Sequence, residues 1–344
     1  MPPTSVIKAA GFESEKTSFV SYHTQMPCRV LKRVREGSPS VILENDFVSA
    51  EVLPGFGGRI WTLSQTSSSR NWIWHHPNVQ LARHPLGTGY DDHWAGGWEE
   101  LFPNDAAETV FERALPDHGE WWSQAWSWDL VSDGGDMAQI RLWLDCPISN
   151  TMCEKWLTIR DGIPELSIRY RISNRNAQRL FFLLKQHLAV AVQPYDRIEL
   201  PGGDAESVDA EFSSMVQPNV FSWPVSKRKS CLSGDIDMSK VPPASSLAQE
   251  FLYVRNLLDG WCGVFSPTSM SRLRMYFDRQ DFPFVWLFMT YGRWRGLYTV
   301  VLEPCTNLPK SLNAAIERGT SASVLPGNYS EYNITVAITD TGDQ

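Results

Sequence analysis

Hydrophobic and polar residues alternate with a period of two along much of the chain. Residues 166–172 read Leu-Ser-Ile-Arg-Tyr-Arg-Ile, and the same alternation recurs at 140–144 and at 332–338. Successive side chains of a β-strand point to opposite faces of a sheet, so this pattern predicts strands with one buried face and one solvated face.

Further strand-like runs, rich in apolar residues, predict additional strands. They occupy residues 47–53, 59–64, 71–76, 152–160, 180–192, 272–277, 283–291 and 296–303. Turn sequences rich in glycine and proline separate these runs, as in PGFGG at 54–58. One short helix is predicted over 310–318, closed by Gly319. Many antiparallel strands with almost no helix predict an all-β protein built as a large antiparallel sandwich.

The sequence shows no internal repeat and no clear linker. We therefore expect a single sandwich domain over residues 36–344, with residues 1–35 as an N-terminal extension packed on it. Residues 204–248 are the most irregular part of the chain and predict a long excursion from the sandwich.

Composition limits the classes of partner. The 344 residues are 42% hydrophobic and 20% charged, which suffices for a large core. The 31 Lys and Arg residues against 39 Asp and Glu residues give a net charge of −8, so we expect neither nucleic acid nor an anionic membrane as a partner. The chain also contains 15 tryptophans, whose flat amphipathic rings suit either a core or the face of a sugar.

The N-terminal sequence lacks the basic and apolar regions of a secretory signal, and no apolar run reaches the roughly 18 residues of a membrane span. The six cysteines are scattered and form no CxxC pair. These features predict reduced thiols and a cytoplasmic protein. Period-two patterns do not separate core faces from interface faces, so both a monomer and a homodimer remain open.

Several familiar catalytic motifs are missing. The sequence contains no Walker loop, no GxSxG elbow and no HExxH motif. His75, His76, His84 and His93 lie close together, but their spacing matches no metal-ligand pattern. We therefore expect neither a metal nor another cofactor.

Two polar residues interrupt apolar strands. His187 lies within KQHLAVAV, where it is either an ordinary core histidine or a functional one. Glu303 ends an apolar run just before Pro304, where it is either a solvated charge at a strand end or a carboxylate facing a cleft. A carboxylate in a buried run is costly unless it is paired or used.

Two aromatic loops add further candidates. The segment DHGEWW at 117–122 places His118 before Trp121 and Trp122. The segment DDHWAGGWEELFPND at 91–105 is polar, aromatic and contains glycine, and it is either a surface loop or a binding loop.

In this order the motifs resemble a known family. The series comprises GGRI at 57–60, GGWEELFPN at 96–104, the HG of 118–119, the QH of 186–187, LEPCT at 302–306 and LPG at 325–327. It resembles the aldose 1-epimerase (galactose mutarotase-like) superfamily, over roughly residues 40–340. The resemblance implies a twisted β-supersandwich with few short helices.

The resemblance also implies roles for individual residues. His187 matches the general acid of the family and Glu303 its general base. His118 matches a histidine that contacts the sugar ring, and Arg59 matches a substrate-binding arginine. A substrate-binding aspartate expected between the acid and the base is not clearly placed, and Asp259 and Asp278 are the candidates.

Two positions depart from the family pattern. Trp122 stands where some relatives carry an arginine, which disfavours a phosphate clamp there, and Glu99 stands where proline is common. We expect the faces of Trp98, Trp122 and Trp286 to contact the apolar side of a sugar. We expect Arg59, His118 and Glu99 to hold its hydroxyls.

The resulting hypothesis is an isomerase that interconverts the anomers of a small sugar by opening and closing its ring, without a cofactor. Two alternatives remain open: a non-catalytic carbohydrate-binding protein, and a carbohydrate lyase or hydrolase on a related fold. The isomerase hypothesis requires that His187 and Glu303 face each other in one cleft.

Overall fold

The computed structural model describes residues 27–68, 70–229 and 234–340. Nineteen strands form one continuous ribbon in which every neighbouring pair is antiparallel. In order of pairing, the ribbon runs through β14 (Arg197–Glu199), β20 (Trp261–Ser266), β21 (Ser271–Phe277), β25 (Tyr329–Asp340), β11 (Glu165–Asn174), β10 (Thr151–Arg160), β9 (Met137–Cys146), β8 (Ser127–Gly135), β1 (Cys28–Arg35), β2 (Ser38–Glu44), β3 (Val48–Leu53), β4 (Arg59–Gln65), β5 (Trp98–Leu101), β13 (Lys185–Val190), β23 (Tyr298–Cys305), β22 (Phe284–Tyr291), β19 (Ala248–Arg255), β15 (Asp204–Ser207) and β16 (Phe221–Ser222).

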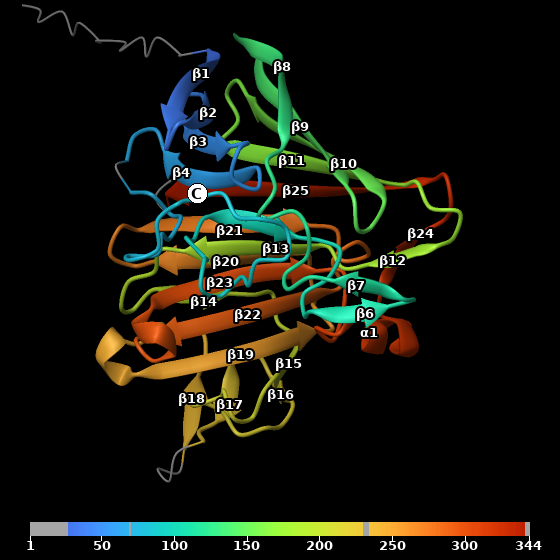
Figure 1. Ribbon diagram of the computed structural model, residues 1–344. Helices are drawn as coiled ribbons and strands as arrows, with labels where there is room; N and C mark the ends of the chain where they lie inside the picture. The colour runs from blue at the N-terminus through green and yellow to red at the C-terminus, as the bar shows by residue number, and fades with distance from the viewer. Residues whose placement is uncertain (1–26, 69, 230–233, 341–344) are drawn as a thin grey trace, which may run out of the picture.

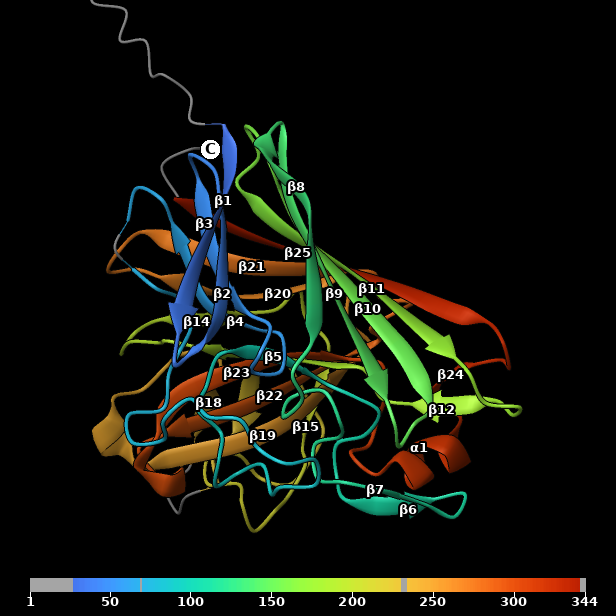
Figure 2. The ribbon, with the colours of Figure 1, turned by 45° about the horizontal axis from the view of Figure 1, so that its top comes forward.

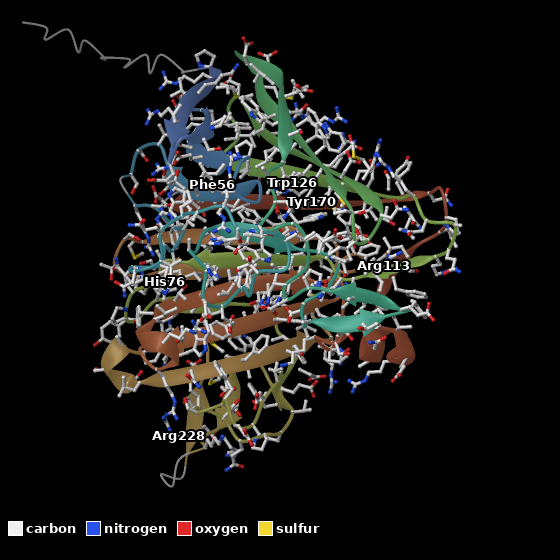
Figure 3. All side chains as sticks on the ribbon, in the orientation of Figure 1. Phe56, His76, Arg113, Trp126, Tyr170 and Arg228 are labelled. Atoms are coloured by element: carbon white, nitrogen blue, oxygen red, sulfur yellow. The ribbon has the colours of Figure 1, made fainter. Side chains whose placement is uncertain are left out.

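The ribbon folds back on itself, so that its two arms pack face to face (Figures 1 and 2). β3 lies against β11, and β20 lies against β23. The alternation at 166–172 places Leu166, Ile168 and Ile172 in the core between the arms, together with Tyr170, which Figure 3 labels. The predicted all-β antiparallel supersandwich is therefore confirmed.

Short elements decorate the ribbon. They are the pairs β6 (Glu108–Val110) with β7 (Arg113–Leu115), β12 (Leu180–Phe182) with β24 (Ala322–Val324), and β17 (Val225–Lys227) with β18 (Asp235–Asp237), two 3₁₀ turns, η1 (Ala244–Ser246) and η2 (Trp294–Gly296), and the helix α1 (Leu312–Arg318). The helix agrees with the prediction at its C-terminus, where Gly319 adopts a positive φ of 68°. At its N-terminus the side chain of Ser311 accepts a hydrogen bond from the backbone of Ala314, which sets the start two residues later than predicted.

Two predicted strands differ in the structure. Residues 71–76 form only isolated bridges, from Ile73 to Val190 and from His75 to Gly96. Their backbone hydrogen bonds are divided among three segments, at residue 63, at residues 189–191 and at residues 95–97, so no continuous ladder forms. The run 180–192 divides into β12 and β13 because Leu183 leaves the ladder and donates its backbone N–H to the carbonyl of Pro103.

The N-terminal boundary also differs. β1 pairs with β2 along its whole length and with β8 at its first two residues, so residues 28–35 belong to the ribbon. The boundary expected at residue 35 falls inside this hairpin, whose turn contains Glu36 and Gly37 at positive φ. Residues 1–26 of the expected extension lie outside the described residues. Within the part of the chain that the structure describes, no helix is long and apolar enough to cross a membrane.

Candidate active site

Adjacent strands β13 and β23 carry three polar side chains that line one cavity. Lys185 and His187 are two positions apart on β13 and therefore point to the same face. Nε2 of His187 lies 3.6 Å from Oε1 of Glu303 on β23. His187 is 6% exposed and Glu303 is 1% exposed, and both line a cavity of about 240 Å³. The structure thus brings together the two residues that the sequence singled out as acid and base.

Lys185 lies between two carboxylates of this cavity. Its Nζ lies 2.8 Å from Oε2 of Glu303 and also forms an ion pair with Asp105. The same nitrogen sits 4.4 Å from the centroid of the Trp286 ring. Burial alone would lower the pKa of Lys185, but Asp105 and Glu303 raise it above its usual value, so the ammonium stays charged. Burial raises the pKa of Glu303, and Lys185 opposes that rise.

A chain of hydrogen bonds and ion pairs holds the other side of the histidine. The Tyr90 hydroxyl lies 3.1 Å from Nδ1 of His187 and donates a hydrogen bond to Glu99. Glu99 in turn forms a buried ion pair with Arg59. The Tyr90 hydroxyl has only one proton, and it donates that proton to Glu99. In the hydrogen bond between Tyr90 and His187 the donor is therefore Nδ1–H of His187, and the Tyr90 oxygen accepts. Nε2 of His187 is then free to accept a proton on the side of Glu303.

The charge state of His187 follows from its surroundings. Burial lowers its pKa well below the usual value, and Lys185, His118 and Arg59 lower it further. The imidazole is therefore neutral at neutral pH.

His118 forms another wall of the cavity. Its Nδ1 lies 2.8 Å from Oδ1 of Asp117, and its ring stacks on Tyr90 with centroids 4.0 Å apart and an interplanar angle of 7°. Burial would lower the pKa of His118, but Asp117 and Asp105 raise it above the usual value. The side chain is thus a better proton and hydrogen-bond donor than His187.

The aromatic walls of the cavity differ from the predicted ones. They are Tyr90, Trp94, Phe212, Phe251, Phe288 and Trp294. The ring of Trp94 meets His187 edge to face, with centroids 5.4 Å apart. Trp94 is 2% exposed, and its indole N–H has no hydrogen-bond partner among the described residues.

The three predicted indoles lie behind the cavity and are not among the residues that line it. Trp98 is fully buried and donates its N–H to Gln186 at 2.9 Å. Trp286 is also fully buried and donates to the carbonyl of Asn307 at 3.1 Å. Trp122 packs edge-on against Tyr90. Their faces are covered by protein, so their contribution is to packing.

Arg59 and Glu99 also lie outside the cavity lining, although the sequence predicts contacts with sugar hydroxyls. Arg59 donates to the carbonyl of Gly96 at 2.6 Å and pairs with Glu99. The link between this pair and the cavity is Tyr90, which lines the cavity and donates a hydrogen bond to Glu99. Of the six residues predicted to bind substrate, His118 alone lines the cavity.

Neither candidate aspartate reaches the site. Asp259 accepts from the backbone of Gly260 at 2.7 Å and Asp278 from that of Gln280 at 2.8 Å, and both bonds are exposed turn contacts. The carboxylates that line the cavity besides Glu303 are Asp91, Asp105 and Asp209. Asp91, Trp94 and Asp105 all belong to the segment 91–105. The polar and aromatic composition of that segment therefore indicated, in the sequence, that it contributes to the site.

The cluster of four histidines has local roles. His75 stacks on Trp61 with centroids 3.7 Å apart and bonds to the Trp61 carbonyl at 2.7 Å. His84 and His93 contact each other. Among the described residues, no group of three or more His, Cys, Asp or Glu side chains is arranged to hold a metal ion.

The fold of this chain is similar to that of several solved structures. A galactose mutarotase-like protein from Clostridium acetobutylicum matches with a TM-score of 0.67 at 12% identity, over 92% of this chain and 99% of the other. A galactose mutarotase-like protein from Lactobacillus casei matches with a TM-score of 0.60 at 14% identity, over 87% and 100% of the two chains. The chain therefore has the galactose mutarotase-like fold.

A third solved structure covers a similar extent of the chain. The Slr1438 protein from Synechocystis sp. PCC 6803 matches with a TM-score of 0.62 at 15% identity, over 91% of this chain and 97% of the other. No protein-family model matches the sequence, and neither does any curated protein. The likeness is one of fold.

Proposed function

We propose that this protein interconverts the anomers of a small neutral sugar, with His187 and Glu303 as the pair that moves protons. The observation that carries the proposal is the 3.6 Å approach of His187 Nε2 to Glu303 Oε1 inside a cavity with aromatic walls. The galactose mutarotase-like fold supports the same class of reaction, because proteins of that description share this architecture.

Ring opening needs one proton removed from the anomeric hydroxyl and one delivered to the ring oxygen. His187 and Glu303 together hold one proton for this exchange. With the proton on His187, the imidazolium donates and Glu303 accepts, which are the roles that the family resemblance implies. With the proton on Glu303 the roles are exchanged, and the lowered pKa of His187 favours this arrangement.

Ring closure uses the same two groups in reverse. After rotation about the C1–C2 bond, the group that accepted the anomeric proton returns it to the carbonyl oxygen, and the other group removes the proton from the former ring hydroxyl. The enzyme returns to its starting state, and no bond to the protein forms. General acid–base catalysis by each group contributes roughly 10²–10⁴-fold.

The remaining polar groups of the cavity would hold the sugar. His118 is a donor for hydroxyl or ring oxygens, and Trp94 contributes an aromatic wall. Lys185 opposes the rise in the Glu303 pKa and stabilises its charged form. Trp294 and Phe251 offer apolar faces to the C–H side of the ring.

The charges of the lining favour a neutral sugar. Four carboxylates, those of Asp91, Asp105, Asp209 and Glu303, share the cavity with two lysines, Lys185 and Lys310. The lining therefore carries no excess of positive charge to hold a phosphorylated or uronic sugar.

A binding protein without catalysis is the second candidate. The observation in its favour is the Lys185–Glu303 ion pair at 2.8 Å, which occupies one oxygen of the carboxylate. NMR exchange spectroscopy on a panel of neutral and phosphorylated aldoses separates the two. We expect accelerated exchange between anomeric signals for at least one neutral sugar. Binding with exchange at the buffer rate for every sugar would leave only the second candidate.

A further inference from the structure

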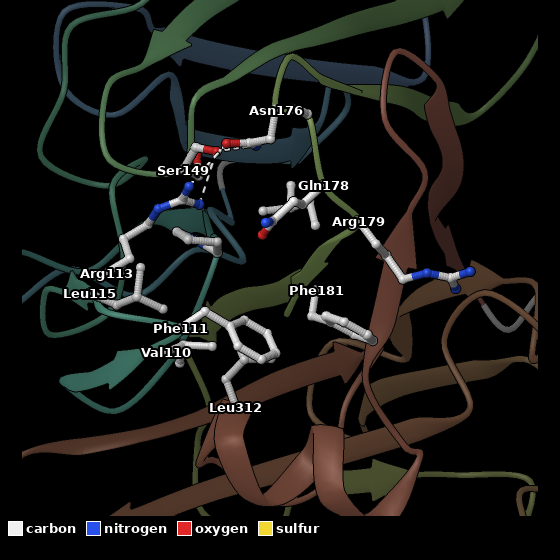
Figure 4. A pocket seen from close by; sticks show the side chains of 13 residues that line it. Val110, Phe111, Arg113, Leu115, Ser149, Asn176, Gln178, Arg179, Phe181 and Leu312 are labelled. Carbon is white, nitrogen blue, oxygen red and sulfur yellow. Dashed lines mark hydrogen bonds between the residues drawn. The ribbon is translucent and has the colours of Figure 1, made fainter.

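A second cavity, distinct from the candidate active site, lies where the β6–β7 hairpin, the segment 176–181 and α1 meet (Figure 4). Its volume is about 230 Å³, close to that of the first cavity, and the two share no lining residue. Figure 3 labels Arg113 in this region, at a distance from His76 on the opposite flank of the molecule.

Arg113 supplies a fixed positive charge to this cavity. Its Nη1 donates to the carbonyl of Ser149 at 3.3 Å and its Nη2 donates to Oδ1 of Asn176 at 3.0 Å. Both acceptors are neutral, and no carboxylate of the described residues forms an ion pair with Arg113 or lines the cavity. A guanidinium has five N–H donors, so some remain for a ligand. A half-buried arginine that is oriented but not neutralised is suited to a carboxylate or a phosphate.

Two phenylalanines form the apolar side of the same cavity. Phe111 and Phe181 have ring centroids 6.0 Å apart at an angle of 41°. Phe111 is 70% exposed, so its ring is accessible to a ligand. The two rings in Figure 4 lie beside Val110 and Leu312, below the guanidinium of Arg113.

The backbone holds Phe111 in this exposed position at a cost. Phe111 and Glu112 form the two-residue turn of the β6–β7 hairpin, with φ of 46° and 65°. Such turns favour Asn-Gly because bulky residues at positive φ are strained. Strained residues persist where the surrounding structure and a function maintain them.

We propose that this cavity binds a small ring compound that bears a carboxylate or phosphate, with the anionic group on Arg113 and the ring against Phe111 and Phe181. The amide of Gln178 lies between the two arginine side chains of the lining, within reach of ring substituents (Figure 4). The site is independent of the proposed catalysis, because its lining contains arginines and no carboxylate, whereas carboxylates outnumber lysines in the first cavity.

Arg179 provides a matched control. It belongs to the same lining, but its guanidinium points away from the cavity (Figure 4), and its Nη1 donates to Ser323 at 3.2 Å. Changing Arg179 to Gln alters the net charge as much as changing Arg113 to Gln. Only Arg113→Gln removes the charge inside the cavity.

The test is a titration followed by NMR or calorimetry with four probes: glucuronate, glucose 6-phosphate, benzoate and glucose. We expect the anionic rings to bind and glucose not to bind at this cavity. Arg113→Gln should weaken binding roughly tenfold or more, as the loss of a charged hydrogen bond does. Arg113→Lys should recover part of the affinity, and Phe111→Ser should weaken binding without unfolding the protein, because the ring is exposed. Tighter binding of glucuronate and glucose 6-phosphate would identify the ligand as a carbohydrate, and tighter binding of benzoate would identify it as an aromatic compound.

Arg179→Gln and His187→Ala should leave the affinity within about twofold of the wild type, which is a small free-energy change. The proposal is overturned if Arg113→Gln binds the anions as tightly as the wild type, if glucose binds equally well and Arg113→Gln weakens that binding too, or if His187→Ala abolishes the binding of the anions. The last result would place the anion in the first cavity. A failure of sugar isomerisation leaves this result unaffected, because the titration measures binding alone.

Discussion

The hydroxyl of Tyr90 lies 3.1 Å from Nδ1 of His187 and donates its own proton to Glu99. This hydrogen bond sets which ring nitrogen of His187, the candidate catalytic histidine, carries the proton. Tyr90 is buried and lies outside every motif identified in the sequence. The same arrangement also explains why Arg59 and Glu99 are buried beside the site without lining it: they fix the direction of the Tyr90 proton.

Tyr90→Phe should therefore lower the catalytic rate without a comparable loss of sugar binding. Without the hydroxyl, Nδ1 of His187 has no partner and the two tautomers of the ring are both populated. We expect kcat to fall roughly tenfold with KM changed little, in line with the usual size of a lost hydrogen bond to a catalytic group. Saturation kinetics followed by NMR exchange measures both constants. A rise in KM at constant kcat would show that Tyr90 binds substrate instead.

The rate should depend on pH as a bell. The pair His187–Glu303 is active with one proton, so activity falls when a second proton binds at low pH and when the last proton leaves at high pH. Lys185 lowers the pKa of both groups. Lys185→Met should therefore raise both pKa values and move the whole bell to higher pH.

Lys155→Met is the control for that shift. Lys155 is another buried lysine, paired with Glu100 at 2.7 Å, but it does not line the cavity. Both variants leave a buried carboxylate unpaired and should lose stability, by roughly 3–5 kcal/mol. Only Lys185→Met should move the pH profile. Equal profiles in the two variants would mean that Lys185 has no electrostatic influence on the pair.

Two tryptophans should respond to mutation in opposite ways. Trp98 is fully buried, so Trp98→Ala should cost about 3–5 kcal/mol of stability and leave the sugar affinity of the folded fraction nearly unchanged. Trp94 lines the cavity, so Trp94→Phe, which keeps most of the packing but reduces the aromatic wall, should weaken sugar binding with little change in melting temperature. Calorimetric unfolding and a sugar titration on each variant measure the two effects. A Trp94 variant with normal affinity would show that this indole does not contact the ligand.

The sequence was sufficient for the fold because period-two alternation reports directly which face of a strand is buried. Leu166, Ile168 and Ile172 are core residues as the pattern predicts. The pattern failed at residues 71–76, where three consecutive apolar residues, 72–74, are buried but form no regular ladder of strand hydrogen bonds. Local hydrophobicity reports burial there but not hydrogen-bond pairing.

The site could be predicted only in part. His187 and Glu303 were accessible because a polar residue in an apolar strand is unusual, and His118 because the family resemblance covers it. Trp94 and Trp98 are the same residue type and lie four positions apart, and only tertiary packing decides that Trp98 is core and Trp94 lines the cavity. Asp105 was missed because its role depends on Lys185, which is 80 positions away along the chain.

Anomer exchange in the wild type and in two single variants tests the central claim most directly. The measurement is NMR exchange spectroscopy on a neutral aldose, with His187→Ala and Glu303→Gln beside the wild type and Lys155→Met as the control. We expect the wild type and the control to accelerate exchange well above the buffer rate, and each of the other two variants to lose roughly 10²–10⁴-fold. Exchange at the wild-type rate in folded His187→Ala or Glu303→Gln would contradict the assignment of this pair as the proton-transfer groups.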